Sequence, residues 1–351
     1  MIYRHSLAKY FILALLLGLL FTINIFVSTN IHQQLSAPLT KLDLGVNVDM
    51  ASMIPNTPYT IKTTTGGNFF DLAAQLGINT LRITDNELEN SGQEYSRTLW
   101  RYVFDESERH HMHVILLIED GKGHSAIQQM HMLLNDYGLV QSPALWLIDL
   151  YNEPDLSDPR LMAMLREEAA YVHQIAPAIP ITIGGWKSQD PEHPGKFIWQ
   201  NPADIPRFIN LVNVVSAHLY EFEEGTQQGF TPRQWTQRFL SAVRQDAMHK
   251  PILLEEFGAG NGLAPTKKPK ATGSPTWQDY VYRGVLQEVS TEYDQGVIGA
   301  VAWIFAPRPP EPHPSRHNFE GDMTGWALVL NHGQHLLPAA WEFSAVMHNK
   351  Q

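Results

Sequence analysis

Residues 145–154 read LWLIDLYNEP, and residues 252–258 read ILLEEFG. Each stretch is an apolar run of strand length that ends at a carboxylate, Glu153 in the first and Glu256 in the second. Because burying a charge without a partner is costly, a carboxylate at the end of a buried strand indicates a chemical role. Two such carboxylates in one fold are what acid catalysis and nucleophilic attack at a single bond require.

Similar apolar runs recur along the chain and predict its strands. They lie at residues 44–48, 80–84, 114–118, 146–150, 181–184, 214–218, 252–256 and 298–303. Amphipathic stretches between them predict helices at residues 69–76, 95–111, 124–137, 158–174, 204–211, 231–249, 275–295 and 339–348. This alternation after residue 41 predicts one α/β catalytic domain over residues 41–351, a (β/α)8 TIM barrel. A doubly wound open sheet is the alternative, but no G-x-G-x-x-G loop follows the first strand.

The composition agrees with one large globular domain. Of the 351 residues, 44% are hydrophobic and 17% charged, which excludes an intrinsically disordered chain. The net charge of −11 disfavours binding to nucleic acid. The absence of cysteine excludes disulfides, thiolate metal sites and cysteine nucleophiles. The 16 histidines show no H-E-x-x-H spacing. We therefore expect no metal, no cofactor and no nucleic-acid partner, and a monomer.

The first 40 residues are predicted to lie outside the barrel. Residues 1–9 contain Arg4 and Lys9, and residues 10–28 read YFILALLLGLLFTINIFVS, without a charge. This length approaches that needed to span a bilayer, so we expect an uncleaved transmembrane signal anchor, followed by a polar linker over residues 29–40. The positive-inside rule then places residues 1–9 in the cytoplasm and the catalytic domain in the periplasm or outside the cell. A cleaved signal peptide and a secreted protein are the alternative.

In a barrel, the carboxyl ends of all strands open onto one face. The ends of the predicted strands contribute Arg82, Asn152, Glu153, His218, Tyr220, Glu256 and Trp303. Each of these residues alone has a plain structural interpretation, such as a core histidine or a salt-bridged arginine, but their convergence favours a functional site. Trp186 follows Gly184 and Gly185 at the fifth strand. Because paired glycines let a ligand approach the backbone closely, we expect the Trp186 indole to line the cleft.

These motifs resemble the clan A glycoside hydrolases, in particular the cellulase and mannanase type of glycoside hydrolase family five. The motifs are Asn152-Glu153-Pro154 after the fourth strand, His218-Leu219-Tyr220 after the sixth, Glu256-Phe257-Gly258 after the seventh, and Trp303 at the eighth. GWAL at residues 325–328, NHG at 331–333 and PAAW at 338–341 also resemble this family. The resemblance covers nearly everything after Lys41 and implies a TIM barrel that hydrolyses β-linked sugars with retention of configuration.

The resemblance implies different roles for the two glutamates. Glu153 would be the general acid/base, which needs a raised pKa to be protonated when the leaving oxygen departs. Glu256 would be the nucleophile, kept ionised by Arg82 and Tyr220, which are similarly placed in the family. Retaining enzymes hold these carboxyl groups about 5–5.5 Å apart, and we expect this separation here.

The resemblance also implies contacts to the substrate. Asn152 would hold the 2-hydroxyl of the sugar, and His218 would hydrogen-bond near the acid/base or the substrate. Trp303 would form the platform under the sugar at the cleavage point. The motif places the nucleophile directly before Phe-Gly, which selects Glu256 over its neighbour Glu255. Since adjacent strand residues point to opposite sides, we expect Glu255 to face the helix layer.

Two departures from the family pattern affect the expected substrate. Residues 117–120 read LIED where the family often has a histidine, and Tyr151 stands where tryptophan is frequent. The missing histidine argues against a standard cellulase more than against the clan, and the two departures together leave the exact family and the substrate open. We expect a β-linked polysaccharide or oligosaccharide, with a β-glucan or β-mannan as the first candidate. A transglycosylase and a non-hydrolytic carbohydrate-binding barrel are the alternatives. A barrel isomerase or aldolase would need a phosphate-binding glycine motif or a Schiff-base lysine, and the sequence has neither pattern.

Overall fold

The computed structural model describes residues 42–57, 60–63, 66–84, 93–118, 125–193, 195–263, 273–306 and 325–348. The expected cytoplasmic segment, membrane anchor and linker (residues 1–9, 10–28 and 29–40) lie outside these ranges. The chain divides into two units, Met1–Lys41 and Leu42–Gln351, and the described residues all belong to the second. Within the described ranges, no helix combines the length and the apolar character needed to cross a membrane.

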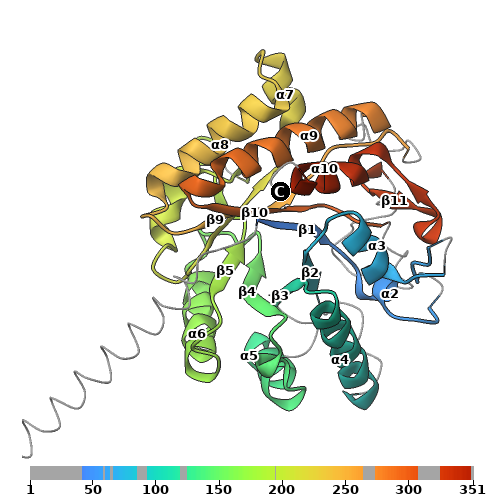
Figure 1. Ribbon diagram of the computed structural model, residues 1–351. Coiled ribbons are helices and arrows are strands. Elements are labelled where there is room, and N and C mark those ends of the chain that lie inside the picture. The colour runs from blue at the N-terminus through green and yellow to red at the C-terminus, as the bar shows by residue number, and fades with distance from the viewer. Residues whose placement is uncertain are drawn as a thin grey trace, which may run out of the picture. The chain divides into compact units, whose positions relative to one another are not determined.

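Eight parallel strands close into a barrel (Figure 1). Their order around the barrel is β1-β10-β9-β8-β5-β4-β3-β2. The strands are β1 (Asp43–Asn47), β2 (Thr80–Thr84), β3 (His113–Leu117), β4 (Leu145–Asn152), β5 (Ile181–Gly184), β8 (Val215–Leu219), β9 (Ile252–Phe257) and β10 (Val297–Ala302). Each overlaps one predicted strand, so the predicted (β/α)8 barrel is confirmed.

Helices cover the outside of the barrel, with α8, α9 and α10 along one side of the strands and α4, α5 and α6 along the other in the view of Figure 1. The α-helices are α2 (Met50–Met53), α3 (Phe69–Gln75), α4 (Gln93–Arg109), α5 (Ala126–Met130), α6 (Pro159–Ile175), α7 (Phe222–Gln227), α8 (Pro232–Asp246), α9 (Pro275–Glu292) and α10 (Glu342–His348). One π-helix, η1 (His131–Asp136), and the 3-10 segments η2 (Leu139–Gln141), η3 (Pro202–Arg207), η4 (Tyr293–Gln295), η6 (Asn331–Gly333) and η7 (Pro338–Trp341) complete the helical structure of the described residues.

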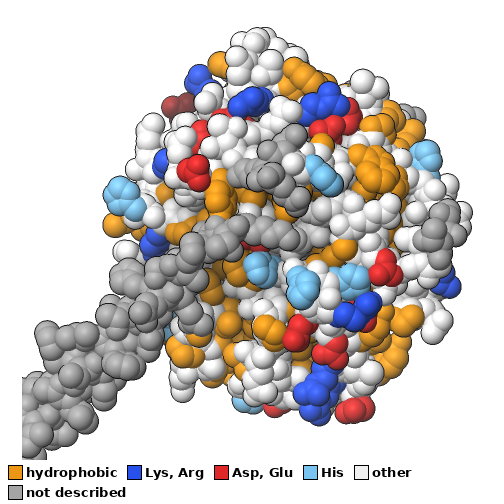
Figure 2. All heavy atoms as spheres, in the orientation of Figure 1, with side chains coloured by type: hydrophobic (Ala, Val, Ile, Leu, Met, Phe, Trp, Pro, Cys, Tyr) orange, Lys and Arg blue, Asp and Glu red, His pale blue; other side chains and the backbone are white. Residues whose placement is uncertain are grey.

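Two antiparallel hairpins accompany the barrel. They are formed by β6 (Lys187–Gln189) with β7 (Phe197–Trp199), and by β11 (Val329–Leu330) with β12 (His335–Leu336). The hairpins, α2 and α7 were not predicted from the sequence. On the face shown in Figure 2, acidic and basic side chains of the described residues are interspersed, so the net charge of −11 does not form one continuous acidic surface there.

Local sequence signals determine where helices begin. The Asn68 side chain accepts the Asp71 N–H, and the Asp71 side chain accepts the Asn68 N–H in return, so two otherwise unpaired donors are satisfied at the start of α3. Thr231 caps α8 in the same way. The helix expected over residues 204–211 is instead the 3-10 segment η3, because Pro206 lacks the N–H that an α-helix would use there.

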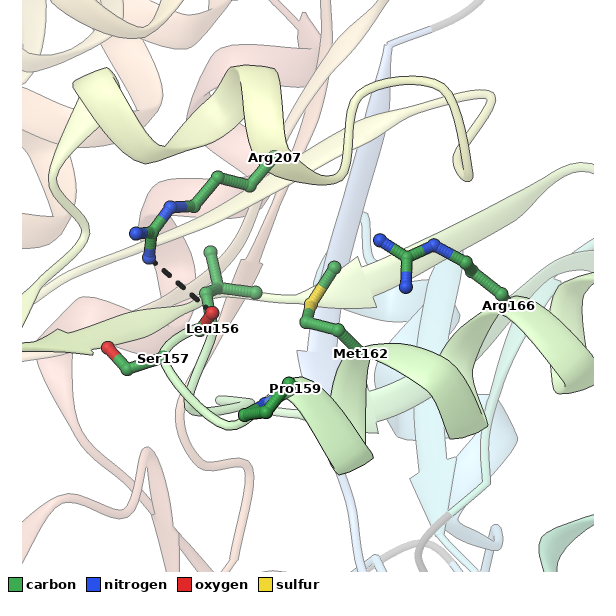
Figure 3. Close-up of a pocket in the computed structure, with 6 residues that line it drawn as sticks. All are labelled: Leu156, Ser157, Pro159, Met162, Arg166 and Arg207. Carbon is green, nitrogen blue, oxygen red and sulfur yellow. Dashed lines mark hydrogen bonds between the residues drawn. The ribbon is translucent and has the colours of Figure 1, made fainter.

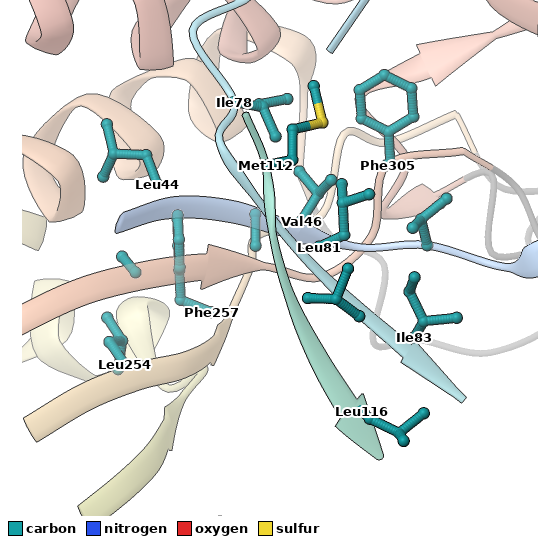
Figure 4. Packing of buried hydrophobic residues seen from close by; sticks show 14 of the residues in the cluster. Leu44, Val46, Ile78, Leu81, Ile83, Met112, Leu116, Leu254, Phe257 and Phe305 are labelled. Carbon is teal, nitrogen blue, oxygen red and sulfur yellow. The ribbon is translucent and has the colours of Figure 1, made fainter. Parts of the chain in front are cut away.

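Alternating strand residues form two hydrophobic layers. A small cluster fills the barrel interior: Ile115, Leu147, Val214, Leu253, Ile298 and Val301. A larger layer lies between strands and helices and includes Val46, Leu81, Leu116, Leu254 and Phe257, drawn in Figure 4. Because both faces of each strand are buried, the strands are apolar almost throughout their length. Polar residues near the strand ends are the exception, and they form the candidate site.

Candidate active site

The two glutamates singled out in the sequence lie side by side at the carboxyl ends of the barrel strands. Glu153 directly follows β4, and Glu256 lies near the end of β9. His218 Nδ1 lies 3.0 Å from Glu153 Oε1 and 3.5 Å from Glu256 Oε2. One oxygen of each carboxylate and one histidine nitrogen lie within 4.8 Å of one another. The fold therefore joins residues from three distant parts of the chain into one polar centre.

The two carboxylates have unequal partners. Arg82 Nη1 donates to Glu256 Oε1 at 2.6 Å, and the Tyr220 hydroxyl donates to Glu256 Oε2 at 2.6 Å. The Glu256 side chain is 6% exposed, whereas that of Glu153 is 24% exposed and shares its hydrogen bond with His218. Both oxygens of Glu256 therefore accept short hydrogen bonds from buried donors. Glu153 is the carboxylate that is open to a reactant.

Tyr220 is a permanent donor to Glu256. Burial and the negative charge of Glu256 raise the pKa of Tyr220 well above its usual value. Its ring meets Trp326 edge to face, with the ring centroids 5.7 Å apart. The contact with Trp326 fixes the direction in which the Tyr220 hydroxyl points.

Arg82 connects the nucleophile candidate to three other polar residues. It donates to Asp149 Oδ2 at 2.7 Å, to Asn152 Oδ1 at 2.8 Å and to Asn47 Oδ1 at 2.8 Å. Burial opposes the charge of Arg82, but the surrounding carboxylates outweigh burial and raise its pKa above the ordinary value. Asn47 and Asp149 were not among the predicted site residues. Both lie inside predicted strands, and a polar residue in a buried strand is the signal that would have identified them.

A β-bulge in β9 turns two consecutive glutamates toward the interior. Two successive residues of β8 pair with Leu254 and Glu256, which leaves Glu255 as an extra residue in β9. An extra residue interrupts the alternation of side chains along a strand. The prediction that Glu255 faces the helix layer is therefore wrong. Its side chain is fully buried, and its Oε1 lies 3.4 Å from Arg82 Nε.

Glu255 and Asp149 form an acidic layer beneath the site. Burial, followed by repulsion from Asp149, raises the pKa of Glu255 well above the ordinary value. Burial also raises the pKa of Asp149, although Arg82 opposes this shift. The single charge of Arg82 is shared among Asp149, Glu255 and Glu256. Because unpaired buried charge is costly, this environment favours the neutral form of Glu255.

The pKa of Glu153 is shifted in the direction opposite to the expectation. Burial acts to raise it, but the hydrogen bond with His218 and the positive charges of Lys187 and Arg82 outweigh burial and lower the pKa below that of an ordinary glutamate. The raised pKa expected for an acid/base is therefore absent in the free protein. The physical reason is the buried His218, which lies at hydrogen-bond distance from the carboxylate.

The backbone of Glu153 adopts a left-handed conformation, with φ of 53°. Non-glycine residues rarely adopt this conformation, and such strain concentrates at functional sites. A second bulge directly precedes Glu153. Asp149 pairs with Thr182 and Asn152 pairs with Gly184, so β4 advances by three residues where β5 advances by two. The Glu153 N–H donates to the Gly184 carbonyl at 2.7 Å. Together these features direct the Glu153 side chain into the site.

Gly184 and Gly185 accommodate the site's own side chains rather than a ligand, which corrects the interpretation made from the sequence. A Cβ atom on Gly184 would lie 2.5 Å from Arg82 Nη2 and 2.6 Å from Asp149 Oδ2. A Cβ atom on Gly185 would lie 2.8 Å from His218 Nδ1, and the φ of this residue is +65°. Both glycines are therefore needed for the polar centre to form.

Trp186 does not line a cleft in this structure, contrary to the expectation. It is fully buried, packs against Phe208, and donates from Nε1 to the Asn201 carbonyl at 2.8 Å. Its carbonyl accepts from Gln200 Nε2 at 3.0 Å, and Gln200 Oε1 accepts the His218 N–H at 3.0 Å. The backbone of Trp186 is thus linked through the Gln200 side chain to the backbone of His218, and this link helps to position His218.

Trp303 directly follows β10 and is partly exposed. Its N–H donates to the Phe257 carbonyl at 2.8 Å, and its carbonyl accepts from the Tyr282 hydroxyl at 3.2 Å. These bonds hold Trp303 beside the strand that carries Glu256. Its role as a sugar platform stays a prediction.

Glu153, His218 and Glu256 are also spaced closely enough to hold a metal ion. However, both oxygens of Glu256 already accept hydrogen bonds from Arg82 and Tyr220. A cation bound there would displace these donors and lie beside a guanidinium group, which is electrostatically unfavourable. The donor set therefore fits a pair of reacting carboxylates better than a metal site.

A hollow of about 340 Å³ lies beside the loop that follows β4 (Figure 3), and neither Glu153 nor Glu256 is among its lining residues. Its lining residues are Leu156, Ser157, Pro159, Met162, Arg166 and Arg207. The loops after β2, β3, β9 and β10 include residues 85–92, 119–124, 264–272 and 307–324, which lie outside the described part of the chain. The described residues therefore define the floor of the site and its β4–β8 side.

No family model and no curated protein matches this chain, but solved structures do. The GH53 catalytic domain from Ignisphaera aggregans matches with a TM-score of 0.64 and 15% identity, over 89% of this chain and 97% of that chain. The endo-β-1,4-mannanase from Thermotoga petrophila matches with a TM-score of 0.53 and 15% identity, over 87% and 76%. The Pseudomonas stutzeri endoglucanase Cel5A matches with a TM-score of 0.54 and 15% identity, over 87% of this chain and 93% of that chain. The chain thus shares its TIM-barrel fold with clan A glycoside hydrolases at low identity.

Proposed function

We propose that this protein is a retaining glycoside hydrolase that cleaves O-glycosidic bonds in a β-linked polysaccharide or oligosaccharide by double displacement. The observation that carries the proposal is the pair of neighbouring carboxylates with unequal partners. Glu256 is hydrogen-bonded at both oxygens by Arg82 and Tyr220, as an ionised nucleophile requires. Glu153 is bound by His218 and partly exposed, as a residue that exchanges protons with the substrate requires.

The spacing of the carboxylates supports retention of configuration. Oxygens of Glu153 and Glu256 lie within 4.8 Å of each other. Retaining enzymes hold the two groups about 5–5.5 Å apart, whereas inverting enzymes need about 6.5–9.5 Å so that a water molecule fits beside the sugar. The observed spacing is closer to the retaining geometry.

The proposed reaction proceeds in two balanced steps. In the first, Glu256 attacks the anomeric carbon, the glycosidic C–O bond breaks, and Glu153 gives its proton to the departing oxygen. In the second, Glu153 takes a proton from water, the water oxygen attacks the anomeric carbon, and the bond to Glu256 breaks. Two inversions give net retention, and both glutamates return to their starting states. The reaction needs no cofactor.

The lowered pKa of Glu153 in the free protein sets a condition on this reaction. The acid form must be present when the leaving oxygen departs, yet His218 and neighbouring positive charges favour the carboxylate. A bound sugar excludes water from the exposed part of the Glu153 side chain, and desolvation raises the pKa of a carboxyl group. We infer that substrate binding itself promotes protonation of Glu153.

A β-glucan or β-mannan is the first substrate to test, with Asn152 and Trp303 as the expected sugar contacts. The uncharged residues 10–28 support a location at the cell membrane, with the catalytic domain in the periplasm or outside the cell. Secretion after cleavage of this segment is the alternative. Fractionation of cells that express the full chain, with protease accessibility of the barrel, tests this location.

The function is tested by hydrolysis of β-linked polysaccharides and aryl β-glycosides, with NMR detection of the first anomer released. We expect the β-anomer first. Glu256→Ala and Glu153→Ala should each lower kcat by about 10²–10⁴-fold or more, and azide should rescue Glu256→Ala with an inverted product. Glu167→Ala, an exposed position on α6, is the matched control and should retain activity. Release of the α-anomer first, or an active Glu256→Ala protein, would contradict the proposal.

A further inference from the structure

The hairpin formed by β6 and β7 lies beside the acid/base candidate. The Lys187 N–H donates to the Pro154 carbonyl at 3.0 Å, and the Lys187 carbonyl accepts the Leu156 N–H at 2.8 Å. Strand β6 therefore runs along the segment that directly follows Glu153. The hairpin follows β5, so it lies at the carboxyl end of the barrel strands, where the polar residues of the candidate site are found.

One face of this hairpin carries a lysine over two exposed aromatic rings. Lys187 and Trp199 are cross-strand partners, and Phe197 precedes Trp199 by two residues, so the three side chains share a face. Lys187 Nζ lies 4.7 Å from the Trp199 ring centroid and 5.4 Å from that of Phe197. The cation–π contacts hold the ammonium group in place. They also occupy the ring faces, so this surface offers a sugar a positive charge rather than a stacking platform.

The ammonium group of Lys187 is available to bind an anion. Across the ranges that the structure describes, it makes no ion pair and no hydrogen bond. Its positive charge nevertheless acts on Glu153, where it favours the carboxylate. The whole chain has a net charge of −11, and charges of both signs are mixed on the face in Figure 2. A lysine that forms no ion pair among the described residues, near the acid/base candidate, is therefore a local feature and not part of a generally basic surface.

Two arginines also lie near the segment that follows Glu153. Arg207 Nη1 approaches the Leu156 carbonyl at 3.4 Å. Arg207 and Arg166 reach over the hollow from opposite sides in Figure 3. Arg207 is also close to an aspartate, whereas Arg166 has no ion-pair partner among the described residues. This side of the site therefore has the positive charge of Lys187 near the acid/base candidate, and those of Arg166 and Arg207 at the neighbouring hollow.

We propose that the leaving-group side of this active site binds an acidic saccharide, with the Lys187 ammonium holding the carboxylate of a uronic acid residue next to the scissile bond. The inference rests on the proposed function, because the general acid defines the side on which the leaving group lies. Glu153 must reach the oxygen that departs, and the sugar attached to that oxygen extends past Glu153 toward the hairpin. Arg166 and Arg207 would meet the next acidic residue of a longer chain.

The test measures binding without turnover. The Glu256→Ala protein is titrated calorimetrically with a β-1,4-linked oligoglucuronate and with its carboxyl-reduced form, the cello-oligosaccharide of equal length. We expect about fivefold tighter binding of the acidic form at low salt, the size of one exposed ionic contact. The preference should disappear in about 1 M salt, where the screening length is only about 3 Å. Lys187→Met should abolish the preference, and Lys196→Met, on the same hairpin, should leave it intact.

Three outcomes would overturn the inference. These are equal binding of the two forms, a preference that survives Lys187→Met, and no detectable binding of either form. Circular dichroism verifies that each variant is folded. The proposed function is assessed separately, by the hydrolysis of neutral aryl β-glycosides by the unmodified protein, so its failure is distinct from failure of the binding preference.

Discussion

Glu255 is a fully buried carboxyl group whose nearest cation, Arg82, is shared with two other carboxylates. Burial and the neighbouring Asp149 raise the pKa of Glu255 well above that of an ordinary glutamate. A carboxyl group with a raised pKa binds more protons in the folded state than in the unfolded state. Its contribution to stability is therefore complete below the unfolded pKa, about 4.3, and is lost as the pH rises through the folded pKa.

We expect Glu255→Gln to remove this pH dependence, because glutamine keeps the shape of the neutral acid and has no proton to lose. As the pH rises above about 5, the free energy of unfolding of the wild type should fall relative to the variant, by up to about 1.4 kcal/mol per pH unit. Urea unfolding at several pH values between 5 and 9 measures the difference. Glu167→Gln on the exposed face of α6 is the control. A difference that stays constant over this range would show that Glu255 is not held neutral.

For individual residues, the sequence identified most side chains of the candidate site but not how the fold shifts their pKa values. Strand ends and short motifs pointed to Arg82, Glu153, His218, Tyr220 and Glu256, all of which meet in the structure. The lowered pKa of Glu153 was not predicted, although His218 was expected near the acid/base, because the sequence does not show that His218, Lys187 and Arg82 together outweigh burial.

Among the elements, β4 and β9 determine how the two carboxylates are oriented, since each contains a bulge directly before Glu153 or Glu256. The sequence predicted the positions of both strands, but a bulge leaves no mark in the hydrophobic pattern, and the direction of Glu255 was therefore misjudged. The hairpin of β6 and β7 was missed for a related reason. Its strands, three residues each, are too short to show an alternating pattern.

Strand β5 contributes through the absence of a side chain. A methyl group on Gly184 would lie 2.5 Å from Arg82 Nη2 and 2.6 Å from Asp149 Oδ2, within a buried network that has little room to move. We expect Gly184→Ala to lower the free energy of unfolding by about 1–3 kcal/mol, as overpacking does, and to reduce kcat/KM by displacing Arg82. Gly229→Ala is the matched control, since its φ of +86° imposes backbone strain but no atom lies within 4 Å. If urea unfolding and kinetics fail to separate the two variants, the packing argument for Gly184 is wrong.

For the whole molecule, the sequence predicted closure of the barrel because eight strand–helix units suffice to close a sheet on itself. Closure depends on β1, which pairs with β10 on one side and with β2 on the other. Its residues Leu44 and Val46 are fully buried, so β1 contributes hydrophobic contacts as well as hydrogen bonds. Strand β1 begins at Asp43, so the fragment 42–351 contains all eight strands of the barrel.

A pair of truncations therefore tests closure directly. We expect the fragment 42–351 to unfold in one cooperative transition and to keep the activity of the full chain. The fragment 49–351 lacks β1, which leaves unpaired edges on β2 and β10 and exposes their apolar neighbours to water. Loss of Leu44 and Val46 removes about 1.5–3 kcal/mol of burial for each side chain, a large fraction of the usual 5–15 kcal/mol of net stability. The shorter fragment should aggregate or melt without a sharp transition, as circular dichroism and size-exclusion chromatography would reveal. A cooperative, monomeric 49–351 fragment would mean that the remaining seven strands can close or shield the sheet without β1.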